Sequence, residues 1–172
     1  VNEIERGTFP KVKLSCVPVT CSHCDNPRCM SQAKDGAVYK REDGIVIIDP
    51  VKAKGQKEIV NTCPYRVIYW NEELQLPQKC DMCAHLLDKG YAVPRCVELC
   101  PTGALTFGDL NDPDSDISKK LASGSGEVLN SDLGLSPSLY YFDLSAAEAM
   151  PVVSAVHRGG NVYKPFEGWS SW

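Results

Sequence analysis

Several features that would assign this sequence to common classes of protein are absent. No apolar run approaches the length of a membrane span, and the longest, such as Ile45 to Ile48, are strand-sized. Basic residues are not in excess: 18 Lys and Arg are interspersed with 22 Asp and Glu, for a net charge of −4. Nucleic-acid-binding proteins usually carry a basic face, so the balance argues against that class. The sequence shows no signal peptide and starts at Val1, which indicates a processed or truncated beginning.

Length and composition allow one compact domain with an extension. Hydrophobic residues make up 43% of the 172 residues, enough for a packed core. The character changes after Gly108: Asn111 to Gly126 is rich in Asp, Ser, Gly and Lys, and no cysteine follows. We therefore expect a cysteine-bearing domain over residues 1–110 and a C-terminal extension over 111–172. The extension ends in Phe166, Trp169 and Trp172, which indicates docking on its own domain or on a partner.

Cysteine is what the sequence has in abundance, with nine residues. Eight of them form fragments of one pattern: Cys21-x2-Cys24-x4-Cys29, Cys63-Pro64, Cys80-x2-Cys83, and Cys96-x3-Cys100-Pro101. Ferredoxin-type chains hold iron–sulfur cubes with such CxxC runs, and the Cys before Pro ligates the other cluster. An odd count in such clusters argues against a disulfide scaffold. Zinc is the stronger alternative, because Cys80, Cys83, Cys96 and Cys100 have the spacing of a four-thiolate site.

The expected secondary structure is short and repeated. Ala37–Lys40 and Ile45–Ile48 flank Asp43-Gly44, a hairpin signal. Asp49-Pro50 predicts a helix to about Asn61. The other expected elements are short strands such as Val12–Leu14, a hairpin of Val67–Trp70 with Gln75–Gln78, helices over Asp81–Lys89 and Pro94–Leu99, and strands over Leu105–Phe107, Leu139–Leu144 and Val152–Val156. The same order of elements, a Cys motif, a helix, a Cys-Pro and a strand, occurs twice along the chain. We therefore predict an α+β, ferredoxin-like fold with a pseudo-twofold axis.

The ligand sets follow from the chemistry of a [4Fe–4S] cube, which takes one thiolate per iron. The first set is complete: Cys21, Cys24, Cys29 and Cys63. The second set, Cys80, Cys83 and Cys96, lacks its remote fourth ligand, and Cys100 is a remote-type ligand that lacks three partners. A cysteine segment upstream of Val1 would complete both. Cys16 is either an ordinary buried thiol or a substitute fourth ligand. We expect no catalytic residues.

Three polar residues lie in or beside these motifs. His23 is expected to shape the cluster environment without binding iron, and Lys79, next to Cys80, either raises the nearby potential or faces solvent. His85 is either a ligand near the second set or, as its residue type favours, a packing or hydrogen-bonding residue.

On these motifs the chain resembles the iron–sulfur subunits of the DMSO reductase family of molybdopterin oxidoreductases. Members carry four Cys motifs and four [4Fe–4S] clusters, paired so that each motif lends its last Cys to its partner's cluster. Here the expected cysteines of one cluster are replaced by Ala33, Ala53, Gln56 and Ile59. This pattern is similar to small subunits of the pyrogallol–phloroglucinol transhydroxylase type, as are Gly36–Val46, Asp49–Glu58 and Cys83–Leu87. The resemblance implies one lost site and three clusters in the complete chain.

The resemblance also implies a role and partners. It implies a non-catalytic electron-transfer subunit in an anaerobic heterodimer with a large subunit that carries a molybdenum or tungsten bis-pterin cofactor, and a possible further electron carrier. Cys100-Pro101-Thr102-Gly103-Ala104 is closer to respiratory arsenate or polysulfide reductase subunits, which remain the alternative. A free-standing ferredoxin and a zinc-binding structural module are further alternatives. We expect a cytoplasmic location, or a periplasmic one by co-export with the large subunit.

Overall fold

The protein consists of three small hairpins and several short helices joined by long loops. The computed structural model describes residues 2–124 and 126–142. The strands are β1 (Asn2–Thr8), β2 (Lys11–Val17), β3 (Val38–Lys40), β4 (Val46–Ile48), β5 (Tyr69–Asn71) and β6 (Leu76–Gln78). The helices are α1 (Arg28–Gln32), α2 (Ala84–Leu87), α3 (Arg95–Glu98) and α4 (Asp116–Ser123), with 3₁₀ turns η1 (Lys57–Thr62) and η2 (Ser131–Leu133).

β1 pairs with β2, β3 with β4 and β5 with β6, each pair in a separate two-stranded antiparallel sheet. The β3–β4 and β5–β6 hairpins lie where the sequence predicts them, with Val38 opposite Ile48 and Tyr69 opposite Gln78. In the first of them Gly44 adopts a φ of +84°, as the turn requires. Since a lone hairpin is marginally stable in water, these two depend on packing against η1 and α1.

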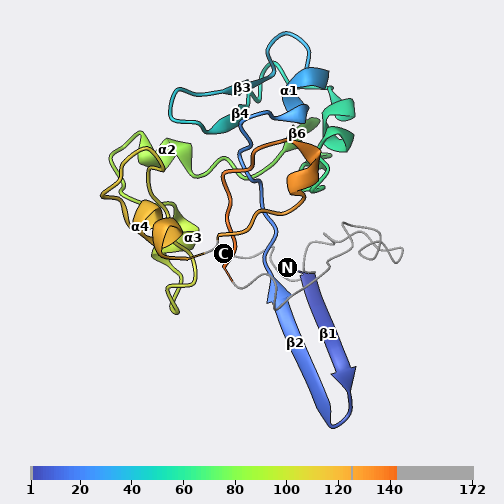
Figure 1. Ribbon diagram of the computed structural model, residues 1–172. Coiled ribbons are helices and arrows are strands. Elements are labelled where there is room, and N and C mark those ends of the chain that lie inside the picture. Colours follow the sequence, from blue (N-terminus) through green and yellow to red (C-terminus); the bar gives the residue numbers. More distant parts are fainter. Residues whose placement is uncertain (1, 125, 143–172) are drawn as a thin grey trace, which may run out of the picture.

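The β1–β2 hairpin extends away from the rest of the molecule (Figure 1). Seven residue pairs connect its strands, where the sequence indicated only short strand-like pieces. Gly7 is required near the turn, because a Cβ there would lie 2.1 Å from the carbonyl oxygen of Lys11. Phe9 at the turn is 92% exposed. Cys16 lies on β2 and is exposed, so the expectation of a buried thiol is wrong: this hairpin has no core to bury it.

The core lies between the β3–β4 hairpin and the turns that follow it. It consists of Ala37, Val38, Val46, Ala53, Ile59 and Ile68, with Cys29, Ala33 and Cys63 among the residues packed against it. Positions expected to fill the place of a lost cluster, Ala33, Ala53 and Ile59, therefore meet in one apolar cluster. Gln56 is also buried, and its side chain bonds the backbone of Lys34 and Lys52.

Several helix and strand predictions are wrong in extent or type. Residues 50–55 form turns and only Lys57–Thr62 is helical, as a 3₁₀ turn, because Gly55 adopts a φ of +80° and interrupts the helix. The helix expected over Asp81–Lys89 is limited to α2, because Met82 and Cys83 both have positive φ. The described residues 105–107 form an irregular segment in place of the expected strand.

The C-terminal part contains α4 and a long irregular segment. α4 begins after Ser115, whose side chain caps the amide of Ser118. After it, residues 126–142, which we call the strap, run back between the two halves of the molecule (Figure 1). Of the described part of the expected Leu139–Leu144 strand, only Tyr141 pairs, in a bridge with Glu127. The expected strand Val152–Val156 and the aromatic residues Phe166, Trp169 and Trp172 lie outside the described residues.

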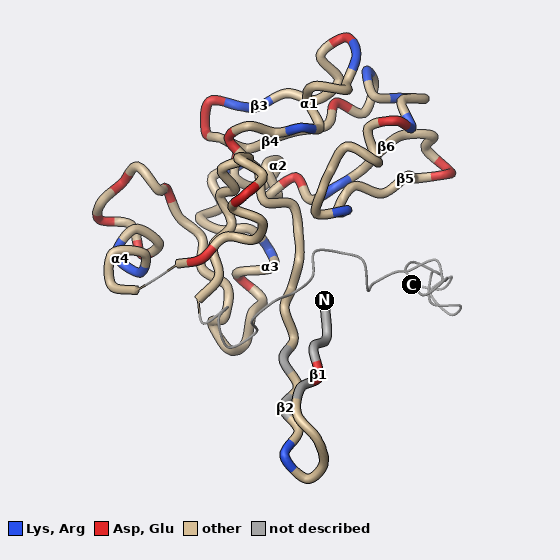
Figure 2. Tube along the Cα trace, turned by 45° about the vertical axis from the view of Figure 1, so that its right-hand side comes forward, with Lys and Arg blue, Asp and Glu red and all other residues tan. Residues whose placement is uncertain are grey.

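Charges of both signs are spread over the molecule (Figure 2). A group of ion pairs connects the β3–β4 hairpin with the segment after α2. Arg41, beside β3, pairs with Asp43 in its own turn and with Asp88 after α2. Among residues 2–124 and 126–142 the longest helix is α4, with eight residues, and none has the length and hydrophobicity to cross a membrane.

Candidate iron–sulfur sites

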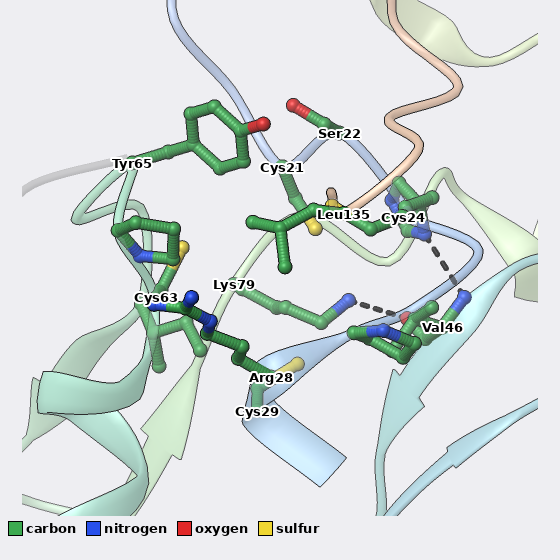
Figure 3. Close-up of a pocket in the computed structure, with 14 residues that line it drawn as sticks. Cys21, Ser22, Cys24, Arg28, Cys29, Val46, Cys63, Tyr65, Lys79 and Leu135 are labelled. Atoms are coloured by element: carbon green, nitrogen blue, oxygen red, sulfur yellow. Dashed lines mark hydrogen bonds between the residues drawn. The ribbon is translucent and has the colours of Figure 1, made fainter. Parts of the chain in front are cut away.

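Four cysteines from two separate segments line one cavity. Cys21 and Cys24 lie in the loop that leads into α1, Cys29 lies in α1, and Cys63 follows η1. Asn26-Pro27 ends the loop, with Pro27 as the cap of α1, so Cys29 is directed inward from the first turn of that helix. Cys63 packs against the same core as Cys29. The complete ligand set predicted from sequence is therefore gathered in space (Figure 3).

The four cysteines that line the cavity provide the number of thiolates that a [4Fe–4S] cube or a zinc ion takes. Among the described residues no three His, Cys, Asp or Glu side chains converge closely enough to bind one metal ion. A cube with iron at each of four corners takes one thiolate per iron, from cysteines placed around it. A tetrahedral zinc site would need all four sulfurs about 2.3 Å from one point.

Burial controls the acidity of these thiols. It raises the pKa of Cys24 and of Cys29 to about 11, and that of Cys21 above its ordinary value. Neighbouring thiols add to the effect, since a second negative charge close by is unfavourable. Lys79 opposes the rise in pKa at Cys21 and Cys29. A metal centre that replaces the protons is therefore needed to hold these cysteines as thiolates at neutral pH.

Lys79 and His23 are two of the polar residues that line the same cavity. Lys79 lies across it and donates hydrogen bonds to the carbonyl oxygens of Val46 and Cys80 (Figure 3). His23 is 2% exposed, and its Nδ1 accepts a hydrogen bond from the Val46 amide at 3.0 Å. Its Nε2 is buried and has no partner among the described residues. A cation and an unpaired donor beside four thiols suit an anionic, sulfur-rich group.

The strap covers this site. The amides of Asp25 and Asn26 donate to the carbonyls of Ser136 and Leu135, and the amide of Ser138 donates to that of Ser22. The Ser138 hydroxyl also donates to the carbonyl of His23. Leu135 is 4% exposed and extends into the cavity (Figure 3). Sequence analysis missed this contact, because nothing local connects two segments about 110 residues apart.

Two of the other candidate cysteines are more exposed than those of the first site. Cys80 and Cys96 are exposed, and Cys83 and Cys100 are half-buried. The Met82 amide donates to the Cys80 sulfur at 3.4 Å, and Cys83 has a left-handed backbone, as in a loop folded around a ligand. Cys80 is close enough to Cys21 to raise the pKa of that thiol, so the first two sites are neighbours.

Cys100 lies in an environment of hydrogen-bond donors. The Thr102 hydroxyl, 3.6 Å from the sulfur, and the amides of Leu105, Ala104 and Thr102 lower its pKa to about 7. A thiol of this acidity is a good iron ligand at neutral pH. His85 is exposed and lies 3.4 Å from Asp81, which agrees with a hydrogen-bonding role.

Comparison with known proteins identifies the family of the cysteine-bearing part of the chain. The model of the 4Fe-4S dicluster domain matches residues 12–110. The chain belongs to this family of iron–sulfur proteins. The resemblance to iron–sulfur subunits of molybdopterin oxidoreductases, drawn from the cysteine pattern, is confirmed, and the fold is a ferredoxin-like dicluster domain with short strands and few helices.

Three relatives show the range of the similarity. The chain is 43% identical over 163 residues to the pyrogallol hydroxytransferase small subunit of Pelobacter acidigallici, covering 93% of this chain and 58% of that protein. It is 36% identical to a subunit of the tetrathionate reductase of Salmonella typhimurium (88% and 61% covered). It is 34% identical to a subunit of the sulfite dehydrogenase of Allochromatium vinosum (82% and 61% covered). The chain thus spans about three fifths of the length of these relatives.

Proposed function

We propose that this chain is the electron-transfer small subunit of a molybdenum or tungsten pterin oxidoreductase. One observation carries the proposal: Cys21, Cys24, Cys29 and Cys63, from two segments, line a single cavity. The relatives named as subunits of a hydroxytransferase, a reductase and a dehydrogenase support a larger catalytic partner. The chain itself relays single electrons and catalyses no bond chemistry.

Three clusters are proposed for the complete assembly. The first is held by Cys21, Cys24, Cys29 and Cys63. The second is held by Cys80, Cys83 and Cys96, and the third by Cys100, with the remaining ligands from a cysteine segment outside residues 1–172. A [4Fe–4S] cluster exchanges one electron at a potential set by its ligands, hydrogen bonds and burial.

Residues of the chain set the electrostatic environment between the first two sites. Lys79 bonds the carbonyl of Cys80 at 3.0 Å and extends into the cavity of the first site. Its charge therefore lies between the two clusters and offsets negative charge on both. Leu135 and the strap exclude water from the first cluster, which strengthens these interactions.

We infer that a fourth cluster site has been replaced by side chains, within a fold that keeps the pseudo-twofold arrangement. Ala33, Ala53 and Ile59 belong to the apolar core or pack on it, and Gln56 hydrogen-bonds across the position with its amide. Restoring all four as cysteines tests this inference: an added cluster of about four iron supports it. An unchanged iron content in a folded variant contradicts it.

A respiratory reductase is the second candidate, favoured by the 36% identity to the tetrathionate reductase subunit. Native, anaerobic purification followed by iron, zinc, molybdenum and tungsten analysis tests the proposal. Iron with a pterin metal in a co-purifying large subunit supports it, and substrate assays of that complex separate hydroxyl transfer from reduction. Iron in a chain that elutes alone indicates a free-standing ferredoxin, and zinc without iron overturns the proposal. We propose a cytoplasmic location, with periplasmic co-export as the alternative that cell fractionation distinguishes.

A further inference from the structure

We propose that His23 donates a hydrogen bond from Nε2 to the cluster held by Cys21, Cys24, Cys29 and Cys63, and thereby raises its reduction potential. The inference rests on the proposed function, because it requires a cluster in that cavity. It assigns a role to a side chain that lies between two ligands but is not itself a ligand.

The protonation of the ring follows from one contact. The Val46 amide can only donate, so Nδ1 of His23, at 3.0 Å, must accept and carries no proton. An imidazole without a proton on Nδ1 carries it on Nε2. The backbone of β4 therefore holds His23 as the tautomer that is a donor at Nε2.

That donor has no partner in the described part of the protein. Nε2 is fully buried in a side chain that is 2% exposed, and no acceptor among residues 2–124 and 126–142 bonds it. An unpaired buried N–H costs about 1–3 kcal/mol, so folded proteins seldom leave one without a ligand or water. His23 also has a φ of +42°, which is unusual for a residue with a side chain.

The cavity supplies the missing acceptor. His23 lines it together with the four cysteines, and much of the remaining lining is apolar, namely Pro27, Val46, Pro64, Ile68 and Leu135. Arg28 and Lys79, which also line the cavity, carry donors only, and the hydroxyls of Ser22 and Tyr65, which can accept, do not bond Nε2 of His23. The sulfurs of a bound cluster are the further acceptors that the chemistry of the site offers. A trapped water is the rival partner.

A hydrogen bond to cluster sulfur has a predictable electrical effect. Reduction adds one negative charge to the cluster, and a donor N–H stabilises that added charge more than it stabilises the oxidised form. Removal of the donor should therefore lower the potential. Lys79, the cation in the same cavity, remains in place and does not substitute for a directed N–H.

The variant His23→Asn tests the proposal in the anaerobically purified, cluster-loaded protein with its partners. Asn places an acceptor oxygen near the position of Nδ1 for the Val46 amide, tolerates positive φ, and has nothing at the position of Nε2. His23→Gln is the conservative variant, because its longer amide can place an N–H there. His85→Asn is the matched control: the same substitution at an exposed histidine.

Redox titration followed by electron paramagnetic resonance provides the readout. We expect His23→Asn to reduce the equilibrium constant for reduction about tenfold, which is about 59 mV for a one-electron couple. His23→Gln should recover at least half of the shift, and His85→Asn should leave this cluster's potential unchanged. In the wild type, isotopic labelling of histidine nitrogen should reveal one weakly coupled nitrogen in the spectrum of the reduced cluster, absent in His23→Asn.

The outcomes separate this inference from the proposed function. An unchanged potential in His23→Asn with full iron content, and no histidine coupling in the wild type, overturns the inference and leaves the electron-transfer role intact. Wild-type protein without a redox-active cluster overturns both. If His23→Asn fails to load iron, the nitrogen coupling in the wild type decides: its presence supports the inference and its absence contradicts it.

Discussion

Lys79 donates a hydrogen bond to the carbonyl oxygen of Val46 inside the cavity that four cysteines line. Val46 thus has two roles: its carbonyl positions the cation, and its amide positions His23. One residue of β4 therefore positions two polar side chains of the site, and its own apolar side chain is part of the core.

Removal of the Lys79 charge should lower the potential of the first cluster. Lys79→Met retains much of the side-chain volume but loses an interaction on the order of 1 kcal/mol, or roughly tens of millivolts for one electron. Potentiometric titration measures the shift. Lys89→Met, at an exposed position after α2, is the control, and an equal shift in both variants would contradict a local role.

The strap should protect the first cluster from oxygen. Leu135→Ala removes a buried side chain from the cavity, which should destabilise the protein by about 2–4 kcal/mol and admit solvent. We expect the visible absorption to bleach several-fold faster in air than in the wild type. Leu110→Ala, at a 41% exposed position, should bleach at the wild-type rate. Equal bleaching rates in the two variants would show that the strap does not control access.

Gln56 should contribute to stability but not to iron binding. Gln56→Ala removes three hydrogen bonds to the backbone of Lys34 and Lys52 and leaves buried groups unpaired, at a cost of about 1–3 kcal/mol. Thermal unfolding should show the loss while iron content stays unchanged. Gln32→Ala, at the exposed end of α1, is the control. A loss of iron in Gln56→Ala would contradict the inference that this position only fills space.

Cysteine reactivity in the iron-free chain should follow acidity. At pH 8 Cys100, with a pKa of about 7, is mostly thiolate, whereas Cys24 and Cys29, with pKa values of about 11, are almost entirely protonated. Alkylation followed by peptide mass spectrometry should label Cys100 at least tenfold faster. Raising the pH from 8 towards 11 should reduce the difference. Uniform labelling at pH 8 would contradict the buried first site.

The raised pKa values of Cys24 and Cys29 also predict how the stability of the iron-free protein depends on pH. The pKa values of Cys24 and Cys29 are raised above the ordinary value of 9.0 because burial favours the neutral thiol. Their contribution to stability is therefore present below pH 9 and is lost as pH rises towards 11. The melting temperature should fall over this window, less so in a Cys24→Ala, Cys29→Ala variant. An equal decline in both would contradict the assignment.

Local signals predicted the parts of the fold that local chemistry determines. Asp43-Gly44 identified the β3–β4 hairpin, and Pro94 identified the start of α3. The helix expected after Asp49 fails because Gly55 takes a positive φ inside it. The strap could not be predicted, because its bonds to the cysteine loop join residues more than 100 positions apart.

The candidate site, like the fold, could be predicted from the sequence only in part. The four cysteines of the first set follow from spacing, and the structure brings them together. The donor role of His23 depends on the contact of its Nδ1 with Val46, and the position of Lys79 depends on the same residue. No spacing rule encodes either contact, because both depend on how the hairpin packs against the cysteine loop.

Iron, sulfide and zinc per chain, measured in the wild type, Cys63→Ala and Cys16→Ala, test the central claim most directly. The account predicts iron with matching sulfide and no stoichiometric zinc in the wild type. Cys63→Ala should lose at least one of the roughly four iron atoms of the first cluster. Cys16→Ala, at an exposed position on β2, should lose none. Zinc in place of iron, or full iron in Cys63→Ala, would contradict the account.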